Sequence, residues 1–570
     1  MNIETRILSS LEKVFPTQAP SPAATPFSCL KGEAFAFQLA VFPSPHRGYY
    51  NSFDLRIRAA CTVSVESPAA SSSLPVQVKQ VGYVPSQLPC YADDGRYLTS
   101  SPGLFPDPLY PETAAGFRVL TGRWNSFFIE VFPPEDIAAG IYDITLTLES
   151  DDPLAPSSGL PLTLHVPLTI LNAVLPPSSL KYTCWFHGDC LADYYQVPVF
   201  SEQHWTIMER QLQLAVNRGQ NMLLTPLFTP PLDTGVGLER TTIQLVDVTQ
   251  TGDTYQFDFT KLTRWIEMAQ RCGIRYFEMS HLFTQWGAAA CPKILATVNG
   301  ELRQIFGWNQ LALCAEYKAF LSAFLPALTA YLSAMGLQDV TYFHLSDEPH
   351  ADHLEQYLKI KEFITPLLQS YPIMDAMSDY SYYEQGVCAH PVVATTALDP
   401  FLNGKRPEEF WVYYCCSQGG QHLSNRFMAM PGYRTRILGL QCYKENVAGF
   451  LQWALNFYNS RYSMRHLNPF YETDGDGAFP SGDAFMIYPG ADGMPLESQR
   501  LVIFHEALQD LAALALLERL TSREHVLALM SCDDMGNPVE PISFTTYPTG
   551  EAYLLGLRHR VNQEIASALH

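Results

Sequence analysis

The sequence predicts a multidomain α/β protein with an N-terminal β-sandwich, a central (β/α)8 TIM-like barrel and a small, mainly helical C-terminal unit. Three observations lead to this prediction. The 570 residues are too many for one ordinary hydrophobic core. Short apolar runs fill the first part of the chain, and strand patterns alternate with helix patterns through the middle. Helical spacing then dominates the end. We therefore expect domains at residues 1–175, 176–490 and 491–570.

The N-terminal region carries the signals of β structure. Its apolar runs are short and partly alternating, and clusters of Pro, Gly, Ser and Asp separate them. The clearest runs are 34–42, 126–132, 142–148 and 162–170. Several such strands in about 170 residues are typical of a β-sandwich. The proline-rich segment 175–179 reads as a stiff linker, so we expect the first domain boundary there.

After this linker, strand patterns alternate with helix patterns. Helices are expected at 202–218 and 259–272, and each is followed by a glycine, Gly219 or Gly273, of the kind that caps helix C-termini. Eight strand candidates with interposed helices over about 280 residues are what a (β/α)8 barrel requires. The candidates are 181–187, 221–226, 274–280, the strand leading into 343–350, 373–376, 392–396, 410–415 and 449–453.

The C-terminal region is predicted to be helical. Between residues 497 and 520 the apolar side chains recur at helical spacing. They are Leu501, Phe504, Leu508, Leu511 and Leu514. Two more apolar runs follow at 526–530 and 553–557. We expect these segments to form a small unit that packs on the barrel.

The composition narrows the possible partners and location. The net charge of −21 and the pI near 5.1 disfavour nucleic acid and anionic membranes as partners. Residues 1–16 lack the apolar core of a secretory signal, and no apolar run is long enough to span a bilayer. The thirteen cysteines show no metal-binding spacing and are expected to be mostly free, buried thiols. We expect a soluble, cytoplasmic protein, and its oligomeric state is left open.

The most informative stretch is the octapeptide Phe-His-Leu-Ser-Asp-Glu-Pro-His at residues 343–350. It places two carboxylates, Asp347 and Glu348, at the expected end of a barrel strand, where TIM-barrel enzymes hold catalytic groups. Pro349 cannot donate to a sheet ladder, so we expect the strand to end there. Because adjacent strand residues face opposite sides, both acids reach one pocket only if the backbone departs from regular pleating. A solvated loop with two acids is the alternative interpretation.

Further polar and aromatic residues fall at the expected strand ends. Aromatic faces can cover the apolar side of a sugar ring while carboxylates act at the scissile bond, so the set favours a glycosidase. The predicted substrate-binding residues are Trp185, His187, His281, Asp375, Trp411, Tyr414, Trp453 and Asn456. Each has a structural alternative: the tryptophans also suit a cap on the barrel core, the histidines a buried hydrogen bond, and Asp375 a turn.

No metal or cofactor is predicted. The chain lacks His-x-His and His-Glu-x-x-His, and the pair Asp474 and Asp476 lacks the rest of a calcium-loop pattern. Gly-x-Gly-x-x-Gly, a P-loop and Gly-x-Ser-x-Gly are also missing from the sequence. Dinucleotide, nucleotide and serine-hydrolase chemistry therefore have little support.

Four motifs together carry a resemblance to a known family. They are Trp-Phe-His-Gly-Asp at 185–189, Phe-His-Leu-Ser-Asp-Glu-Pro at 343–349, Trp-Val-Tyr-Tyr-Cys at 411–415 and Gly-Phe-Leu-Gln-Trp-Ala-Leu-Asn-Phe-Tyr at 449–458. With these motifs the chain resembles the DUF4091 proteins, a group similar to glycoside hydrolase family 123, the β-N-acetylgalactosaminidases. The resemblance covers nearly the whole chain, including 425–426, 481–483 and 488–490.

The resemblance implies substrate-assisted hydrolysis of an oligosaccharide or small glycoside by the adjacent carboxylates. Glu348 would be the general acid/base that protonates the leaving oxygen. Asp347 would orient the substrate's 2-acetamido group as it attacks the anomeric carbon, so the intermediate is an oxazoline and no enzyme nucleophile is needed. We expect Glu348 to hold the proton of the pair and Asp347 to stay ionised.

Two other hypotheses stay open. A glycosidase for sugars without a 2-acetamido group would need another carboxylate as nucleophile or base, for which Asp375 and Glu278 are the strand-end choices. The second hypothesis is a barrel that binds carbohydrate without hydrolysing it. This hypothesis predicts saturable sugar binding without turnover.

Overall fold

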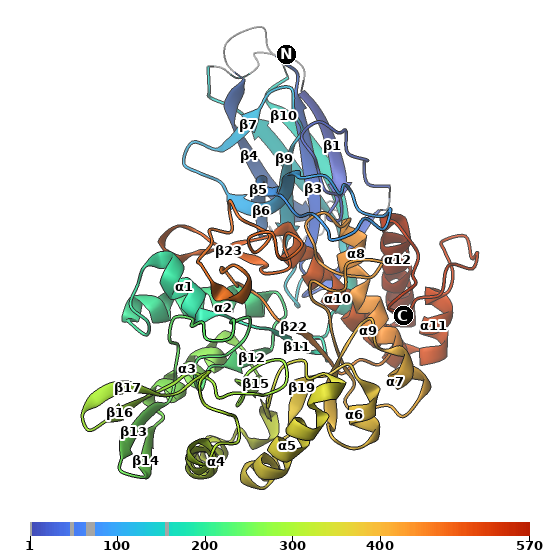
Figure 1. The fold of residues 1–570 in the computed structure, drawn as a ribbon. Coiled ribbons are helices and arrows are strands. Elements are labelled where there is room, and N and C mark those ends of the chain that lie inside the picture. The colour runs from blue at the N-terminus through green and yellow to red at the C-terminus, as the bar shows by residue number, and fades with distance from the viewer. Residues whose placement is uncertain are drawn as a thin grey trace. The chain divides into compact units, whose positions relative to one another are not determined.

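The computed structural model describes residues 3–569 apart from Thr25, 46–50, 64–73, Leu154 and 156–158. The chain forms two compact units (Figure 1). The first consists of residues 1–179, 419–445 and 496–570, and the second of 180–418 and 446–495. The C-terminal residues thus share a unit with the N-terminal strands. The division into three domains at residues 175 and 490 stays a prediction.

Two five-stranded sheets make up the N-terminal part of the first unit. One has the order β1(Ile3–Ser9)-β3(Phe35–Pro43)-β8(Asn125–Val131)-β5(Val76–Ser86)-β6(Gly103–Pro111), and the other β2(Phe27–Lys31)-β10(Leu162–Val174)-β9(Gly140–Glu149)-β4(Ser52–Val63)-β7(Phe117–Leu120). Side chains from both sheets, such as Phe37 and Ile129 from one and Phe53 and Ile144 from the other, form a single buried core. The expected N-terminal β structure is confirmed as two sheets packed face to face.

Eight parallel strands form the sheet of the second unit, in the order β18-β15-β12-β11-β22-β21-β20-β19. Their bounds are β11(Lys181–Cys184), β12(Met222–Thr225), β15(Tyr276–Met279), β18(Thr341–Phe343), β19(Met374–Ala376), β20(His390–Ala394), β21(Trp411–Tyr413) and β22(Gly449–Gln452). A parallel bridge between Phe343 and Ile373 links the two ends of the sheet, and the Phe343 N–H donates to the Pro372 carbonyl at 2.9 Å. Each strand overlaps a predicted segment, although β20 begins at His390, before the predicted start at residue 392. The expected TIM-like barrel is confirmed as a nearly closed sheet.

Helices lie around these strands (Figure 1). They are α1(Gly188–Tyr195), α2(Glu202–Asn217), α3(Thr260–Cys272), α4(Ala315–Ala334), α5(Leu354–Leu368), α6(Tyr380–Glu384) and α7(Asp399–Asn403), with short 3-10 turns at Gln338–Val340, Ala351–His353, Arg461–Ser463 and Ala491–Gly493. Gly273 closes α3 with a φ of 109°, a left-handed conformation that glycine adopts without steric cost, as the sequence predicted.

One small sheet was not predicted. It has the order β14(Thr254–Asp258)-β13(Asp247–Thr251)-β16(Ile294–Val298)-β17(Glu301–Phe306) and consists of two hairpins inserted after β12 and β15. β13 and β17 are exposed at most positions, so they lack the apolar alternation that marks a half-buried strand. β14 does alternate, with Tyr255 and Phe257 between polar residues, and this signal was overlooked. Two further short strands, β23(Ile487–Pro489) and β24(Pro495–Glu497), precede the last helices.

The helices of the first unit pack on one another and on the β-sheets. They are α8(Gly432–Arg436), α9(Leu438–Lys444), α10(Gln499–Leu520), α11(Arg523–Met530) and α12(Glu551–Ala568). In α9, Gly439 lies so near α10 that a Cβ would be 2.0 Å from the Ala507 carbonyl oxygen. A buried ion pair of 2.6 Å joins Arg558 of α12 to Glu33, between β2 and β3. The predicted C-terminal helices therefore pack against α8 and α9, which connect two barrel strands, and against the β domain.

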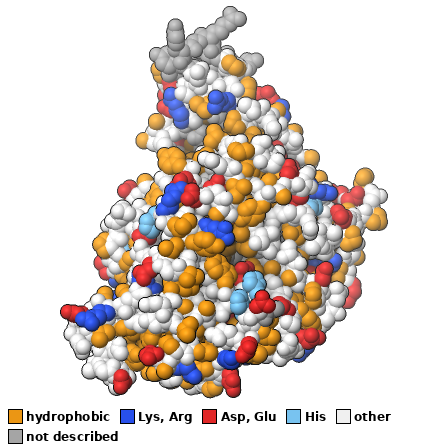
Figure 2. Space-filling model, in the orientation of Figure 1, with side chains coloured by type: hydrophobic (Ala, Val, Ile, Leu, Met, Phe, Trp, Pro, Cys, Tyr) orange, Lys and Arg blue, Asp and Glu red, His pale blue; other side chains and the backbone are white. Residues whose placement is uncertain are grey.

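The surface shows no single dominant charge on the face drawn in Figure 2, where Lys and Arg side chains are interspersed with acidic and apolar ones. None of the helices in the described ranges is long and apolar enough to cross a membrane. The thirteen cysteines are free thiols and most are buried, as expected.

Candidate active site

Alternate residues of the barrel strands point inward and fill the barrel, and Trp411 belongs to this buried cluster. Trp411 is the first residue of β21, and its ring lies against Gly449, where a Cβ would be 2.2 Å from it. It also contacts the Tyr342 ring, whose hydroxyl accepts a 2.6 Å hydrogen bond from Lys181 at the start of β11. Trp411 therefore fills the amino end of the barrel, away from the carboxyl ends where we expected it to contact substrate.

The segment that carries the two adjacent carboxylates leaves the sheet early. We had expected the strand to end at Pro349, but β18 already ends at Phe343. The backbone N–H of Leu345 donates at 2.9 Å to the side chain of Asp375 in β19, and not to the backbone of that strand. Glu348 then takes a φ of +45°, which is rare for a residue with a side chain. This is the departure from pleating that two adjacent acids need in order to reach one site.

Asp347 and Glu348 are both half-buried and interact electrostatically. Burial, and then the neighbouring charge of Glu348, raise the pKa of Asp347 well above its usual range. Asp375 and Asp233 raise it further, and His344 opposes them. We had expected Glu348 to hold the proton of the pair. Burial and the acidic neighbours instead favour the protonated form of Asp347.

A tyrosine reaches the carboxylate of Glu348. The Tyr413 hydroxyl donates to Glu348 Oε1 at 2.6 Å. Burial raises the pKa of Tyr413 well above its ordinary value, so this hydroxyl remains a donor. Tyr414 points to the other face of the strand, where its ring packs edge-on against Phe450. The tyrosine at the candidate site is thus Tyr413, and not the predicted Tyr414.

A buried ion triad lies beneath the carboxylates. His344 Nε2 is 2.9 Å from Glu278 Oε2, and His344 Nδ1 is 3.5 Å from Asp375 Oδ1. Although burial alone would lower the pKa of His344, hydrogen bonds and charge from Asp375 and Glu278 raise it to about 9. His344 is therefore an imidazolium between two carboxylates at neutral pH.

Both carboxylates of the triad are held by further donors. Glu278 accepts from the Thr183 hydroxyl and, at 3.2 Å, from Trp185 Nε1. Asp375 Oδ2 accepts from the Tyr357 hydroxyl at 2.6 Å. All five side chains are buried. Trp185, predicted to bind substrate, thus lies inside the barrel with its indole N–H on Glu278.

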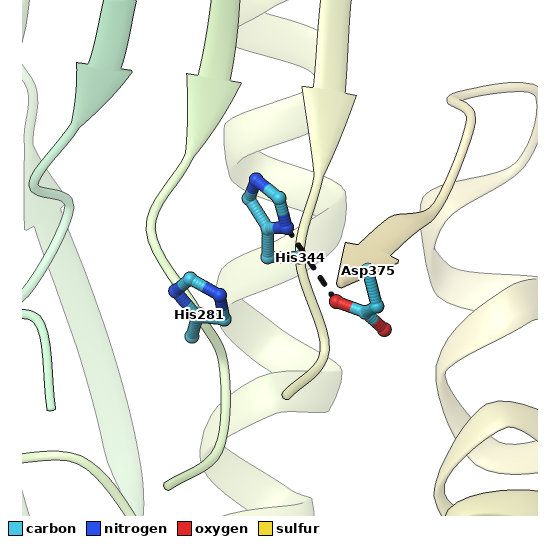
Figure 3. Close-up of side chains that lie close together, drawn as sticks. All are labelled: His281, His344 and Asp375. Carbon is cyan, nitrogen blue, oxygen red and sulfur yellow. Dashed lines mark ion pairs between the residues drawn. The ribbon is translucent and has the colours of Figure 1, made fainter. Parts of the chain in front are cut away.

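His281 lies beside His344 and Asp375 of this triad (Figure 3). Its ring nitrogens have no hydrogen-bond partner among the described residues. Burial, and then the charge of His344, lower its pKa well below the ordinary value, so the ring is neutral. One atom each of His281, His344 and Asp375 lie within 4.8 Å of one another, a spacing near that of a metal site. However, the two imidazoles stack with centroids 4.5 Å apart and planes 20° apart. A metal ion lies in the plane of each imidazole that binds it, and stacked planes do not meet near the rings, so this donor set does not fit a metal.

His187 and Asn456 connect the loop after β11 to the loop after β22 by hydrogen bonds. His187 Nε2 donates to the Trp453 carbonyl at 3.0 Å, and its Nδ1 accepts from Arg240 at 3.0 Å. Burial and the Arg240 charge lower the pKa of His187 to about 4. The Asn456 amide bonds both the N–H and the carbonyl of His187. In contrast, the Trp453 ring is half-buried and held by Asp483 at 2.9 Å, which leaves part of its surface accessible.

The structure thus divides the predicted site residues into three groups. Asp347, Glu348, His281, Asp375, Trp185 and Trp453 lie at the carboxyl ends of the barrel strands, and His187 and Asn456 hold the loops. Trp411 lies at the amino end of β21, and Tyr414 follows β21 but packs its ring against Phe450. The sequence reasoning missed Tyr413, His344 and Asp233. For Tyr413 a signal existed, since it lies two residues from the inward-facing Trp411 and so shares its face of the strand.

Replacing His344 tests the buried triad without reference to activity. A histidine whose pKa is raised on folding stabilises the fold below its unfolded pKa of 6.5, and this stabilisation is lost as the pH rises through about 9. We expect His344→Gln to cost about 3 kcal/mol more at about pH 6 than at about pH 10. Thermal melting at both pH values measures this difference. His187→Gln is the control, because a histidine that is neutral in the fold above about pH 5 should show no such extra cost at the lower pH. Equal costs for His344→Gln at both pH values would contradict the triad.

Comparison with known proteins decides the family. The family model "Glycoside hydrolase 123, catalytic domain" matches residues 185–517, more than half of the chain. The chain belongs to glycoside hydrolase family 123. This family 123 protein is therefore a glycosidase, and the resemblance inferred from its motifs is confirmed.

A solved structure agrees with the fold of this family 123 chain. A family 123 glycoside hydrolase from Clostridium perfringens, from a structural study of glycolipid glycan hydrolysis, aligns with a TM-score of 0.73 at 14% identity, over 100% of this chain and 98% of its own. A family 5 mannosidase from Rhizomucor miehei covers 58% of this chain and 94% of its own at 10% identity, and its TM-score of 0.31 is too low to support any inference. No protein of curated function matches the chain in sequence.

Proposed function

We propose that this family 123 glycosidase is a retaining, exo-acting β-N-acetylhexosaminidase that works through an oxazoline. The observation that supports it best is the coupled carboxyl pair of Asp347 and Glu348 after β18, with Tyr413 bonded to Glu348. Two adjacent acids of this kind serve one reaction centre from one side, which suits a reaction in which the substrate's own acetamido oxygen is the nucleophile. N-acetylgalactosamine is the sugar that the family resemblance favours.

In the proposed mechanism Glu348 protonates the oxygen of the leaving group and later takes a proton from the attacking water. Asp347 accepts a hydrogen bond from the acetamido N–H, which orients the acetamido oxygen toward the anomeric carbon and stabilises the positive charge that develops there. A hydrogen bond from the acetamido N–H favours the ionised form of Asp347, which opposes the effect of burial on this carboxyl.

The neighbouring side chains have supporting roles in this proposal. The accessible part of the Trp453 ring covers the apolar face of the sugar. The ring nitrogens of His281 are buried and have no partner among the described residues, which suits a bound water between this ring and the substrate. Trp185 and Asp375 form the rigid floor that holds the loop of the carboxyl pair.

The contacts of Asp375 and Glu278 give little support to the alternative glycosidase without substrate assistance. That reaction needs an accessible carboxylate as nucleophile or base. Asp375 is buried and accepts bonds from Tyr357 and the Leu345 N–H, and Glu278 is buried against Thr183 and His344. Neither has a carboxylate oxygen free to face a sugar.

Hydrolysis of a panel of chromogenic glycosides, with and without the 2-acetamido group, tests the proposal. We expect cleavage of β-N-acetylhexosaminides and no cleavage of the corresponding glucoside and galactoside. Cleavage of a plain glycoside at a similar rate would contradict substrate assistance. Binding of N-acetylhexosamine without hydrolysis of any glycoside in the panel would point to a non-catalytic carbohydrate-binding protein.

Tyr413→Phe is expected to lower kcat about tenfold or more while KM changes little. The phenol donates to Glu348 at 2.6 Å, and this bond strengthens in the transition state as Glu348 transfers its proton to the leaving group. A hydrogen bond to an ionised group contributes roughly 1.5–3 kcal/mol. Steady-state kinetics on an N-acetylhexosaminide measures the effect. Tyr414→Phe is the matched control, since its ring lies on the other face of β21 and should leave kcat unchanged. Equal effects of the two variants would exclude a specific role for Tyr413.

A further inference from the structure

The loop after β15 lies alongside the loop that carries the carboxyl pair. Four hydrogen bonds join them: the Leu282 N–H to the His344 carbonyl at 3.1 Å, the Phe283 N–H to the Leu345 carbonyl at 3.0 Å, the Ser346 hydroxyl to the Thr284 carbonyl at 3.0 Å, and the Trp286 N–H to the Asp347 carbonyl at 2.8 Å. The last of these fixes the backbone of Trp286 at the peptide that joins Asp347 to Glu348. The position of Trp286 is thus tied to that of the proposed acid.

Trp286 is exposed in spite of its size, and its backbone is strained. Its side chain is 38% exposed, and its φ is +56°. A left-handed conformation costs a bulky residue free energy, and such residues persist mainly where function requires their placement. The following Gly287 is also left-handed and lies against the His353 ring, where a Cβ would be 2.7 Å from it. The turn is therefore packed in place, and it presents the indole to solvent.

A second aromatic side chain supports the indole from a different loop. The Tyr462 ring meets the Trp286 ring edge to face, with centroids 5.8 Å apart and planes 82° apart. Tyr462 is itself left-handed, with a φ of +60°. Its N–H donates to Asp233 at 3.2 Å, and its carbonyl accepts from the Gly235 N–H at 3.2 Å. Asp233 lies close enough to Asp347 to influence its ionisation. Three loops thus bring this aromatic pair to the carboxylates.

We propose that Trp286, supported by Tyr462, is the platform for the sugar ring on the leaving-group side of the scissile bond, so that the substrate is a disaccharide or longer. This inference rests on the proposed function. In an exo-acting enzyme the terminal sugar lies deeper, beside the half-buried Trp453, and the leaving group extends outward past the general acid. Trp286 suits that outward position, because its ring is exposed and its N–H bonds the carbonyl of Asp347. A single exposed indole matches the C–H face of one pyranose and is too small a surface to hold a lipid chain.

Trp286→Ala tests the proposal with two substrates that share the same terminal N-acetylhexosamine. One carries a methyl leaving group, and the other a second hexose. We expect kcat/KM for the disaccharide to fall about tenfold or more, whereas kcat/KM for the methyl glycoside changes less than about threefold, because the methyl group cannot reach the platform. Trp286→Phe keeps an aromatic face and should restore most of the disaccharide activity. Leu302→Ala, at a 69% exposed side chain in β17, is the control and should affect neither substrate.

Several outcomes would overturn the inference. Equal losses on both substrates would mean that Trp286 supports the carboxyl pair and not the leaving group, and unchanged kinetics on both would exclude any contact. A loss confined to a long-chain alkyl glycoside would show an apolar occupant instead of a sugar. The melting temperature shows whether Trp286→Ala folds. If it does not, the activities of Trp286→Phe and Trp286→Leu on the disaccharide are compared instead. Only the aromatic variant should retain activity, and equal activities would contradict the proposal. Failure of wild type on every N-acetylhexosaminide is a different result, which contradicts the proposed function itself.

Discussion

Glu348→Gln is expected to lower kcat/KM on an N-acetylhexosaminide with a poor leaving group by about 10²–10⁴-fold, the usual contribution of a general acid. Glutamine is nearly isosteric and still accepts the Tyr413 hydrogen bond, but it cannot transfer a proton. The loss should be smaller for a substrate whose leaving group departs without protonation, such as a nitrophenolate. Kinetics on a pair of substrates that differ only in leaving-group pKa measures this dependence.

Glu355→Gln is the matched control for this variant. Glu355 is an exposed residue of α5 that pairs with Lys359, so its replacement should leave both substrates unaffected. A Glu348→Gln enzyme with equal losses on good and poor leaving groups would contradict the role of general acid. Full activity on the poor leaving group would show that another residue supplies the proton.

Asp347→Asn is expected to lose at least about 10²-fold in kcat on the N-acetyl substrate, as found when a preorganised group that stabilises transition-state charge is removed. An asparagine side chain cannot offer the carboxylate that holds the acetamido N–H and balances the charge of the oxazolinium. Single-turnover and steady-state rates on the N-acetylhexosaminide measure the loss. Asp352→Asn, at an exposed position just beyond the site, is the control and should remain fully active. Normal turnover in Asp347→Asn would contradict substrate assistance.

The same variant also reports on the raised pKa of Asp347. An acid whose pKa is raised on folding makes the protein less stable as the pH rises above its unfolded pKa, about 3.9 for aspartate, because ionisation is then favoured in the unfolded chain. Asparagine stays neutral and mimics the protonated form. The difference in melting temperature between Asp347→Asn and wild type should therefore shift in favour of the variant as the pH is raised from about 4 to about 8. An unchanged difference across this range would show that Asp347 is ionised in the free enzyme.

The fold could be predicted in large part from local patterns. The strand segments of the barrel and the helix ends at Gly219 and Gly273 depend on apolar periodicity and on glycine, which act over a few residues. Patterns of this kind failed for β13 and β17, because these exposed strands carry no apolar alternation, and for the end of β18. There the Leu345 N–H turns to the side chain of Asp375, a residue about thirty positions away, and no local rule predicts that bond.

The sequence by itself determined the order of the strands, the adjacency of Asp347 and Glu348 at the end of one of them, and through its motifs the family. Only the tertiary structure decided which side chains meet. Tyr413 and not Tyr414 reaches Glu348, and Trp411 lies at the opposite end of the barrel, because a strand of three residues begins at position 411 and its side chains alternate. The raised pKa of Asp347 was likewise decided by the tertiary structure, since burial and charges from other parts of the chain cause it.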